Sequence, residues 1–278
     1  MRAVLMLTSL LLAVAIARAD GCPGLDTPGA SIDTRRAALM ECAKSAGTEP
    51  LAFLLAHVAS LQPRDARLSG YGEFIESWPL DDLMVHAEQL LALAKGESDA
   101  SVASRITAVR ALMAIPKDRR PTGSEAFEPR TIELSAVPSR MTYDKKEIAA
   151  TAGEVIRIHF DNADALEHNL LIVAPGALAE MGLAGDKMGQ VPEGRIKEFI
   201  PDSAKVLAVM GIVAPGASRD FWFIVPGAAG TYPYVCTYPQ HWRMMNGKLK
   251  VAARATAAPA KAATTAPPAT PPSSATPP

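Results

Sequence analysis

Cysteine and histidine are scarce in this sequence, and the small number of each excludes several kinds of cofactor site. The 278 residues contain three cysteines and five histidines. No Cys-x-x-Cys-His motif occurs, so covalent attachment of haem is excluded. Five histidines are also too few for an additional metal cluster of the kind used in oxygen or nitrite chemistry, which would take several imidazole ligands of its own.

An excess of charge of either sign is also missing. There are 28 Lys and Arg against 29 Asp and Glu, which gives a formal net charge of −1. Without a basic surface the chain has no electrostatic means of holding nucleic acid, so we exclude nucleic-acid partners. Beyond the N-terminus no apolar run is long enough to cross a bilayer, so we expect no stable membrane insertion. The apolar fraction of 49% is nevertheless sufficient for a packed core.

The first residues have the pattern of an export signal. Arg2 precedes an apolar run over residues 3–16, and Ala17-Arg18-Ala19 follows it. This order predicts a signal peptide over residues 1–19, cleaved after Ala19, and a periplasmic or secreted protein. The alternative is a lipoprotein modified at Cys22, but Asp20 stands where that signal requires a small residue.

The three cysteines divide into an early pair and a single late residue. In an oxidising compartment we expect Cys22 and Cys42 to form a disulfide. Cys236 then stays unpaired, and a free thiol outside the cytoplasm is open to oxidation. We therefore favour metal ligation by Cys236, with a buried, inert cysteine as the alternative.

Residues 20–118 are predicted to form a helical domain. Apolar residues recur at spacings of three and four over residues 31–116, in helices expected near 33–47, 50–62 and 81–96 and in a fourth that includes Ile106 and Met113 and ends at Pro116. Four short helices indicate a small bundle, whose role the sequence does not reveal. Charge, proline and glycine over residues 119–128 are typical of a linker.

From residue 129 the apolar period changes to two. Ile156, Ile158 and Phe160 alternate with polar residues, and Pro-Gly pairs separate the short segments. Many short strands with regular turns predict an antiparallel β-sandwich or barrel over residues 129–252. Residues 253–278 are almost entirely Ala, Pro, Thr and Ser, so we expect a disordered tail.

One loop of this β region carries a set of metal-binding side chains. His241 follows Cys236 by five residues, and Met245 follows His241 by four. A second imidazole comes from His168, at the end of another predicted strand. A thiolate and two neutral imidazoles in a plane, with a weak thioether on the axis, suit copper in both of its oxidation states.

The segment Cys236-Thr-Tyr-Pro-Gln-His241-Trp-Arg-Met-Met245-Asn-Gly247 resembles the copper loop of the azurin and auracyanin branch of the cupredoxins, the type 1 blue copper proteins. The pattern of that branch is Cys-Thr-Phe-Pro-Gly-His-x-x-x-Met-x-Gly, and His168-Asn169 resembles its first His-Asn pair. The resemblance implies a mainly β protein with an eight-stranded Greek-key sandwich. It also implies one type 1 copper ion, held by His168, Cys236, His241 and Met245.

The loop departs from the family's usual residues at Tyr238, which replaces phenylalanine, at Gln240, and at Trp242, where a small residue is common. Gln240 replaces the glycine that precedes the second histidine, so the backbone there must accommodate a side chain. Met244 lies beside Met245 and competes for the axial place, although the Met-x-Gly spacing favours Met245.

Further residues are expected to support the site or to meet a partner. The resemblance implies that the amide of Asn169 ties the two ligand loops together and that the Glu167 carbonyl lies on the axis opposite the thioether. Pro239, Trp242 and Met244 are predicted to form an apolar docking patch near His241. The resemblance also implies an insertion between two strands over residues 180–208, and the alternative is that such residues pack against this insertion.

A carrier of single electrons is the function that we favour from the sequence. A closed ligand set leaves no open position for a substrate, so we do not expect an enzyme. The expected partner is a redox protein such as a c-type cytochrome or an oxidoreductase. One alternative is copper handling, as a chaperone or buffer, although the sequence lacks the Met-rich or His-rich tracts typical of such proteins. Another is that the helical part binds a partner and the sandwich only anchors it.

Overall fold

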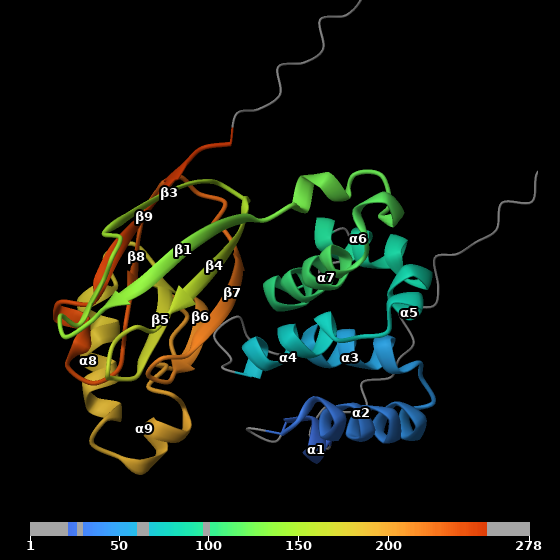
Figure 1. Ribbon diagram of the computed structural model, residues 1–278, viewed down its shortest axis with the longest axis horizontal. Coiled ribbons are helices and arrows are strands. Elements are labelled where there is room, and N and C mark those ends of the chain that lie inside the picture. Colours follow the sequence, from blue (N-terminus) through green and yellow to red (C-terminus); the bar gives the residue numbers. More distant parts are fainter. Residues whose placement is uncertain (1–21, 27–29, 60–66, 97–100, 255–278) are drawn as a thin grey trace, which may run out of the picture.

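The computed structural model describes residues 22–26, 30–59, 67–96 and 101–254, and places a helical region beside a β-sandwich (Figure 1). The predicted signal peptide and all but the first two residues of the predicted tail lie outside the described residues. None of the described helices is long and apolar enough to span a membrane. The expected fold class, a β-sandwich preceded by a helical region, is confirmed by this arrangement.

The helical region begins with a short helix that a disulfide joins to the next one. Cys22, directly before the first helix, is bonded to Cys42, as predicted. The second helix begins after Ser31, whose hydroxyl accepts the Thr34 amide, and ends at Gly47 with a left-handed φ of 65°. The helices are α1 (Pro23–Asp26), α2 (Ile32–Ala46), α3 (Pro50–Ala59), α4 (Arg67–Glu76), α5 (Leu80–Val85), α6 (Ala87–Lys95) and α7 (Val102–Ala114).

Two features of this region differ from the sequence prediction. Helix α4 was not predicted, because its glycines lower helix propensity. A Cβ atom at Gly72 would lie 1.7 Å from the Arg110 guanidinium of α7, so glycine lets α4 pack closely there. The helix expected over residues 81–96 is interrupted at His86, which leaves helical geometry with ψ of 8°. Leu83 and Leu90 are buried on either side of His86. The helical spacing of apolar residues therefore continues across the break, and the sequence predicts one helix where the structure has two.

The sandwich consists of two sheets, with strand orders β2-β1-β4-β7 and β3-β9-β8-β5-β6. Alternate residues of the strands face inward and form an apolar core between the sheets. The strands are β1 (Arg130–Val137), β2 (Thr142–Tyr143), β3 (Glu147–Thr151), β4 (Val155–Asp161), β5 (His168–Val173), β6 (Val206–Val213), β7 (Ser218–Ile224), β8 (Gly230–Val235) and β9 (Asn246–Ala252). Helices α8 (Leu178–Met188) and α9 (Pro192–Ile196) form the insertion between β5 and β6.

Two details of the sheets correct the expectation of eight antiparallel strands. The ninth strand is β2, a two-residue element that pairs with the end of β1. In addition, β1 pairs parallel with β4, and β3 pairs parallel with β9. These parallel partners are distant in sequence, so turn signals between neighbouring segments could not reveal them.

A cation–aromatic contact joins the helical region to the outer face of the sandwich. The Trp222 ring of β7 lies beneath the guanidinium of Arg110, 5.6 Å from the ring centroid, and that of Arg157, 5.9 Å away. Arg110 is buried and its Nε donates to Glu76 of α4 at 2.9 Å. Val155 of β4 also belongs to the apolar cluster of the helices. The two regions therefore share a packed interface.

Candidate metal centre

Strand pairing brings three donor side chains to one end of the larger sheet. His168 is the first residue of β5, and Cys236 directly follows β8. Because β5 and β8 are antiparallel neighbours, the start of one lies beside the end of the other. His241 begins the short 3-10 helix η3 (His241–Arg243), five residues further along the loop. The candidate donor atoms of His168, Cys236 and His241 all lie within 4.8 Å of one another.

The distances show that one ring nitrogen of each histidine faces the sulfur. The Cys236 Sγ lies 3.9 Å from Nδ1 of His168 and 3.7 Å from Nδ1 of His241. The two Nδ1 atoms are 3.2 Å apart. Cys236 and His168 are fully buried and His241 is 5% exposed. The Nδ1 atoms therefore converge with the thiol in an enclosed space.

The protonation states of these side chains suit a soft or borderline metal. Burial lowers the pKa of His168, and burial together with the neighbouring imidazole lowers the pKa of His241 to about 4. Both are therefore neutral at pH 7, as ligation requires. Burial raises the pKa of Cys236 to about 12, although the backbone amides of Asn169 and Tyr238 donate to the sulfur and oppose this rise. A thiol in this position ionises when a cation replaces its proton, so the donor set fits copper.

The two methionines of the loop are placed differently. Met245 is fully buried in the same apolar cluster as Cys236, and its carbonyl accepts the Cys236 amide at 3.0 Å. The Met245 amide donates to the His241 carbonyl at 2.8 Å, which closes the loop on itself. Met244 is 56% exposed. Of the two thioethers, that of Met245 lies in the interior with the sulfur and the imidazoles.

Asn169 joins β5 to the loop that follows Cys236. Its Oδ1 accepts the Thr237 amide at 2.8 Å, and its Nδ2 donates to the Thr237 hydroxyl at 3.0 Å and to the Glu198 carbonyl at 2.8 Å. The Glu167 carboxylate forms an ion pair with Arg195 of α9. An axial position of the Glu167 carbonyl stays a prediction.

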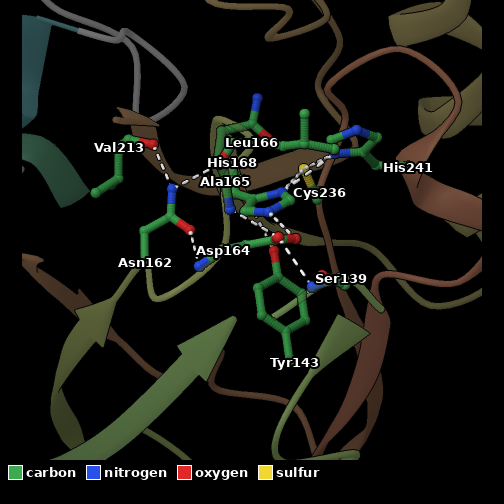
Figure 2. Close-up of polar contacts among 11 residues, drawn as sticks. Ser139, Tyr143, Asn162, Asp164, Ala165, Leu166, His168, Val213, Cys236 and His241 are labelled. Atoms are coloured by element: carbon green, nitrogen blue, oxygen red, sulfur yellow. Dashed lines mark hydrogen bonds and ion pairs between the residues drawn. The ribbon is translucent and has the colours of Figure 1, made fainter. Parts of the chain in front are cut away.

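Sequence reasoning missed Asp164, whose carboxylate contacts the other side of the His168 ring. Oδ2 of Asp164 lies 3.2 Å from Nε2 of His168, and Figure 2 shows this contact beneath the three donors. Burial raises the pKa of Asp164, but backbone amides and His168 bound to the carboxylate more than offset this, and the net shift is downward. The spacing Asp-x-x-x-His was the available signal, but it is too common to mark a site.

Sequence reasoning also missed the helix that covers the loop. The backbone of α8 lies so close to the loop that a Cβ at Gly185 would be 2.3 Å from the Thr237 carbonyl. Gly182 of α8 and Gly189, which directly follows the helix, make similar approaches to Trp242 and Pro239. Glycine at these positions therefore allows the close packing of α8 on the loop.

Asp186 of α8 binds three residues of the loop, one before His241 and two after it. It accepts the backbone amide of Gln240 at 2.5 Å, the indole N–H of Trp242 at 3.0 Å and the guanidinium of Arg243 at 3.0 Å. Gln240 adopts a left-handed φ of 71°, the conformation that glycine adopts readily. The backbone of Gln240 is therefore strained, and the hydrogen bond from its amide to Asp186 helps to stabilise this conformation.

The predicted docking residues fall into two environments. Trp242 is half-buried and packs against Gly182 of α8, so it takes part in holding the insertion. Pro239 lines a surface hollow beside His241, together with Asp186, Gln240 and Arg243. Met244 is exposed but does not line this hollow. Docking by these residues stays a prediction.

The chain matches known copper proteins over its C-terminal part. Residues 130–252 match the model of the copper binding proteins, plastocyanin/azurin family. Auracyanin-A of Chloroflexus aurantiacus is 31% identical over 125 residues, which cover 44% of this chain and 75% of that protein. Auracyanin-B of the same organism is 30% identical over 125 residues, which cover 44% of this chain and 52% of that protein.

The chain is also similar in sequence to a protein of solved structure. Auracyanin A, a "blue" copper protein, is 31% identical to this chain. The match covers 45% of this chain and 99% of that protein's chain, with a TM-score of 0.41. His168, Cys236 and His241 converge, and the chain matches Auracyanin-A over three quarters of that protein's length. The chain therefore belongs to the plastocyanin/azurin family of copper-binding proteins, the cupredoxins.

Proposed function

We propose that this chain is an exported type 1 copper protein that transfers single electrons. His168, Cys236, His241 and Met245 would hold one copper ion, the first three through Nδ1, Sγ and Nδ1, and Met245 through its thioether. The burial of Met245 and the exposure of Met244 support Met245 as the axial ligand. Bound copper supplies one-electron exchange between its two oxidation states.

The observation that carries the proposal is the enclosure of the donors. Cys236 and His168 are fully buried. Asn169 and Asp186 accept hydrogen bonds from two backbone amides of the loop that follows Cys236 and hold that loop in place. Such a site keeps nearly the same geometry in both oxidation states, so little reorganisation opposes electron transfer. It also leaves no open coordination position for a substrate, which argues against an enzyme.

His241 is the ligand closest to solvent, and it lies at the hollow lined by Pro239, Gln240 and Arg243. A redox partner, such as a c-type cytochrome or an oxidoreductase, would dock here and exchange electrons through the imidazole edge. Brief complexes of this kind bury little surface, so a small apolar and polar contact suffices. The proposed location is the periplasm or the exterior, in accordance with the predicted signal peptide.

The test uses the full chain, expressed with its own N-terminal segment so that the host can process any export signal. The purified protein is titrated with Cu(II) and followed by visible absorption and electron paramagnetic resonance, with Cys236→Ser as the matched control. The expected result is one equivalent of bound copper and an intense visible band that bleaches reversibly with a mild reductant and is absent from the variant. A colourless complex contradicts the proposal, and release of copper on reduction points instead to copper handling.

A further inference from the structure

We propose that Asp164 is a positioning residue of the copper site, which holds the His168 proton on Nε2 and whose negative charge lowers the reduction potential. The inference rests on the proposed function for its second half. Its first half concerns the metal-free protein and can be tested separately.

The geometry at His168 assigns a different task to each ring nitrogen. Nδ1 faces Sγ of Cys236 at 3.9 Å and Nδ1 of His241 at 3.2 Å, whereas Nε2 lies 3.2 Å from Oδ2 of Asp164. A neutral imidazole has one N–H and one lone pair, and a carboxylate can only accept a hydrogen bond. Asp164 therefore selects the tautomer with the proton on Nε2, which leaves the Nδ1 lone pair directed at the other donors.

The second oxygen of Asp164 is held by the backbone. Oδ1 accepts the amide of Ser139 at 3.0 Å and the amide of Ala165 at 2.8 Å. Two N–H donors on one oxygen favour the charged carboxylate over the protonated acid, because a carboxylate accepts stronger hydrogen bonds. The side chains of Asp164 and His168 are 3% and 0% exposed, so water does not compete for these contacts.

A buried asparagine fixes the turn that presents the carboxylate. Asn162 is fully buried, and its Oδ1 accepts the Asp164 amide at 3.2 Å. Its Nδ2 donates to the carbonyl of Leu166 at 2.8 Å and to that of Val213 at 2.9 Å. Figure 2 shows these bonds as one network that extends from β6 through the turn to the imidazole. Asp164 is therefore held in one position before any metal binds.

The charge has a direct consequence for the potential. Oxidised copper carries one more positive charge than reduced copper, and a buried negative charge one imidazole away stabilises the more positive state. The low dielectric of the buried site reduces screening of this interaction. Replacing the carboxylate by a neutral amide of nearly the same size removes this negative charge and should therefore favour the reduced state.

The first experiment measures reduction potentials of the full copper-loaded chain. Asp164→Asn should raise the ratio of reduced to oxidised protein at least tenfold at a fixed ambient potential, which corresponds to 59 mV for one electron. Asp161→Asn is the matched control, because it removes the same charge from a residue whose carboxylate accepts from Ser218 and does not contact His168. A shift no larger than that of Asp161→Asn overturns the effect on potential.

The second experiment does not depend on copper or on the stability of a variant. Nitrogen-15 nuclear magnetic resonance of the metal-free wild-type chain reports which nitrogen of His168 carries the proton, and we expect Nε2. A proton on Nδ1 overturns the assignment of Asp164. If the wild-type chain forms no coloured copper complex, the proposed function fails, whereas this measurement still decides the role of Asp164.

Discussion

Asp186 accepts a hydrogen bond from the backbone amide of Gln240, the residue directly before the candidate ligand His241. The contact joins the helical insertion to the loop at its left-handed position, 54 residues away in sequence. The same carboxylate binds Trp242 and Arg243, on the other side of His241. The position of this ligand therefore depends on a helix that supplies no ligand.

Replacement of Asp186 by Asn should loosen the loop. Charge-assisted hydrogen bonds to Gln240, Trp242 and Arg243 would be weakened, and we expect the free energy of unfolding to fall by about 1 to 3 kcal/mol. Chemical denaturation of the metal-free protein measures this change. Glu180→Gln, on the same helix, removes the same charge from an exposed pair with Lys205 and should have little effect. Equal losses in the two variants would contradict the role given to Asp186.

Gly185→Ala tests the close packing of α8 on the loop. The new Cβ would lie 2.3 Å from the Thr237 carbonyl, a backbone atom next to Cys236, so the helix must move. We expect a destabilisation of about 1 to 3 kcal/mol, and a change in the visible spectrum of the copper form. Gly227→Ala is the control, because nothing lies within 4 Å of a Cβ at that position. A spectrum and stability like those of the control would show that α8 can retreat without disturbing the site.

The two adjacent methionines provide a matched pair for the axial ligand. Met245→Leu conserves volume in the core but removes the thioether, so the reduction potential and the electron paramagnetic resonance parameters should both change. Met244→Leu alters an exposed side chain and should leave both unchanged. A spectral change in Met244→Leu and none in Met245→Leu would reverse the assignment.

The metal-free protein should lose stability in mild acid. The pKa of His241 is lowered by burial from 6.5 to about 4, so between these pH values the unfolded chain binds more protons than the folded one. The free energy of unfolding therefore decreases as the pH falls through this window, by about 1.4 kcal/mol for each unit of pKa difference. Denaturation midpoints at pH 7, 5.5 and 4 measure the effect, and His241→Gln should reduce the slope. An equally steep slope in that variant would place the effect on other groups.

Part of the site is determined by residues close together in the sequence. Cys236, His241 and Met245 lie within one ten-residue loop, so a single turn of chain is enough to bring them near each other. The alternation over β4 and the Pro-Gly turns likewise identify strands, because side-chain direction in a strand has a period of two. The pairing of Cys22 with Cys42 was predicted from two cysteines near the start of an exported chain and is confirmed.

Other features depend on partners that are remote in sequence or on packing. Helix α4 was not predicted, and its close packing depends on the guanidinium of Arg110, a remote residue that occupies the space beside Gly72. The parallel pairing of β1 with β4 depends on strands that turn signals do not connect. No local pattern indicated that Asp186 would bind Gln240, because that contact exists only after α8 folds over the loop.

The sequence by itself determined the kind of donor atoms, their spacing in the loop and the sandwich that supports them, since these follow from side-chain chemistry and from a period of two. The tertiary structure decided which nitrogen of His168 faces the sulfur, which methionine is buried and what holds His241. These depend on the pairing of β5 with β8 and on the placement of Asp164 and Asp186, and the resulting distances are set by packing across the whole domain.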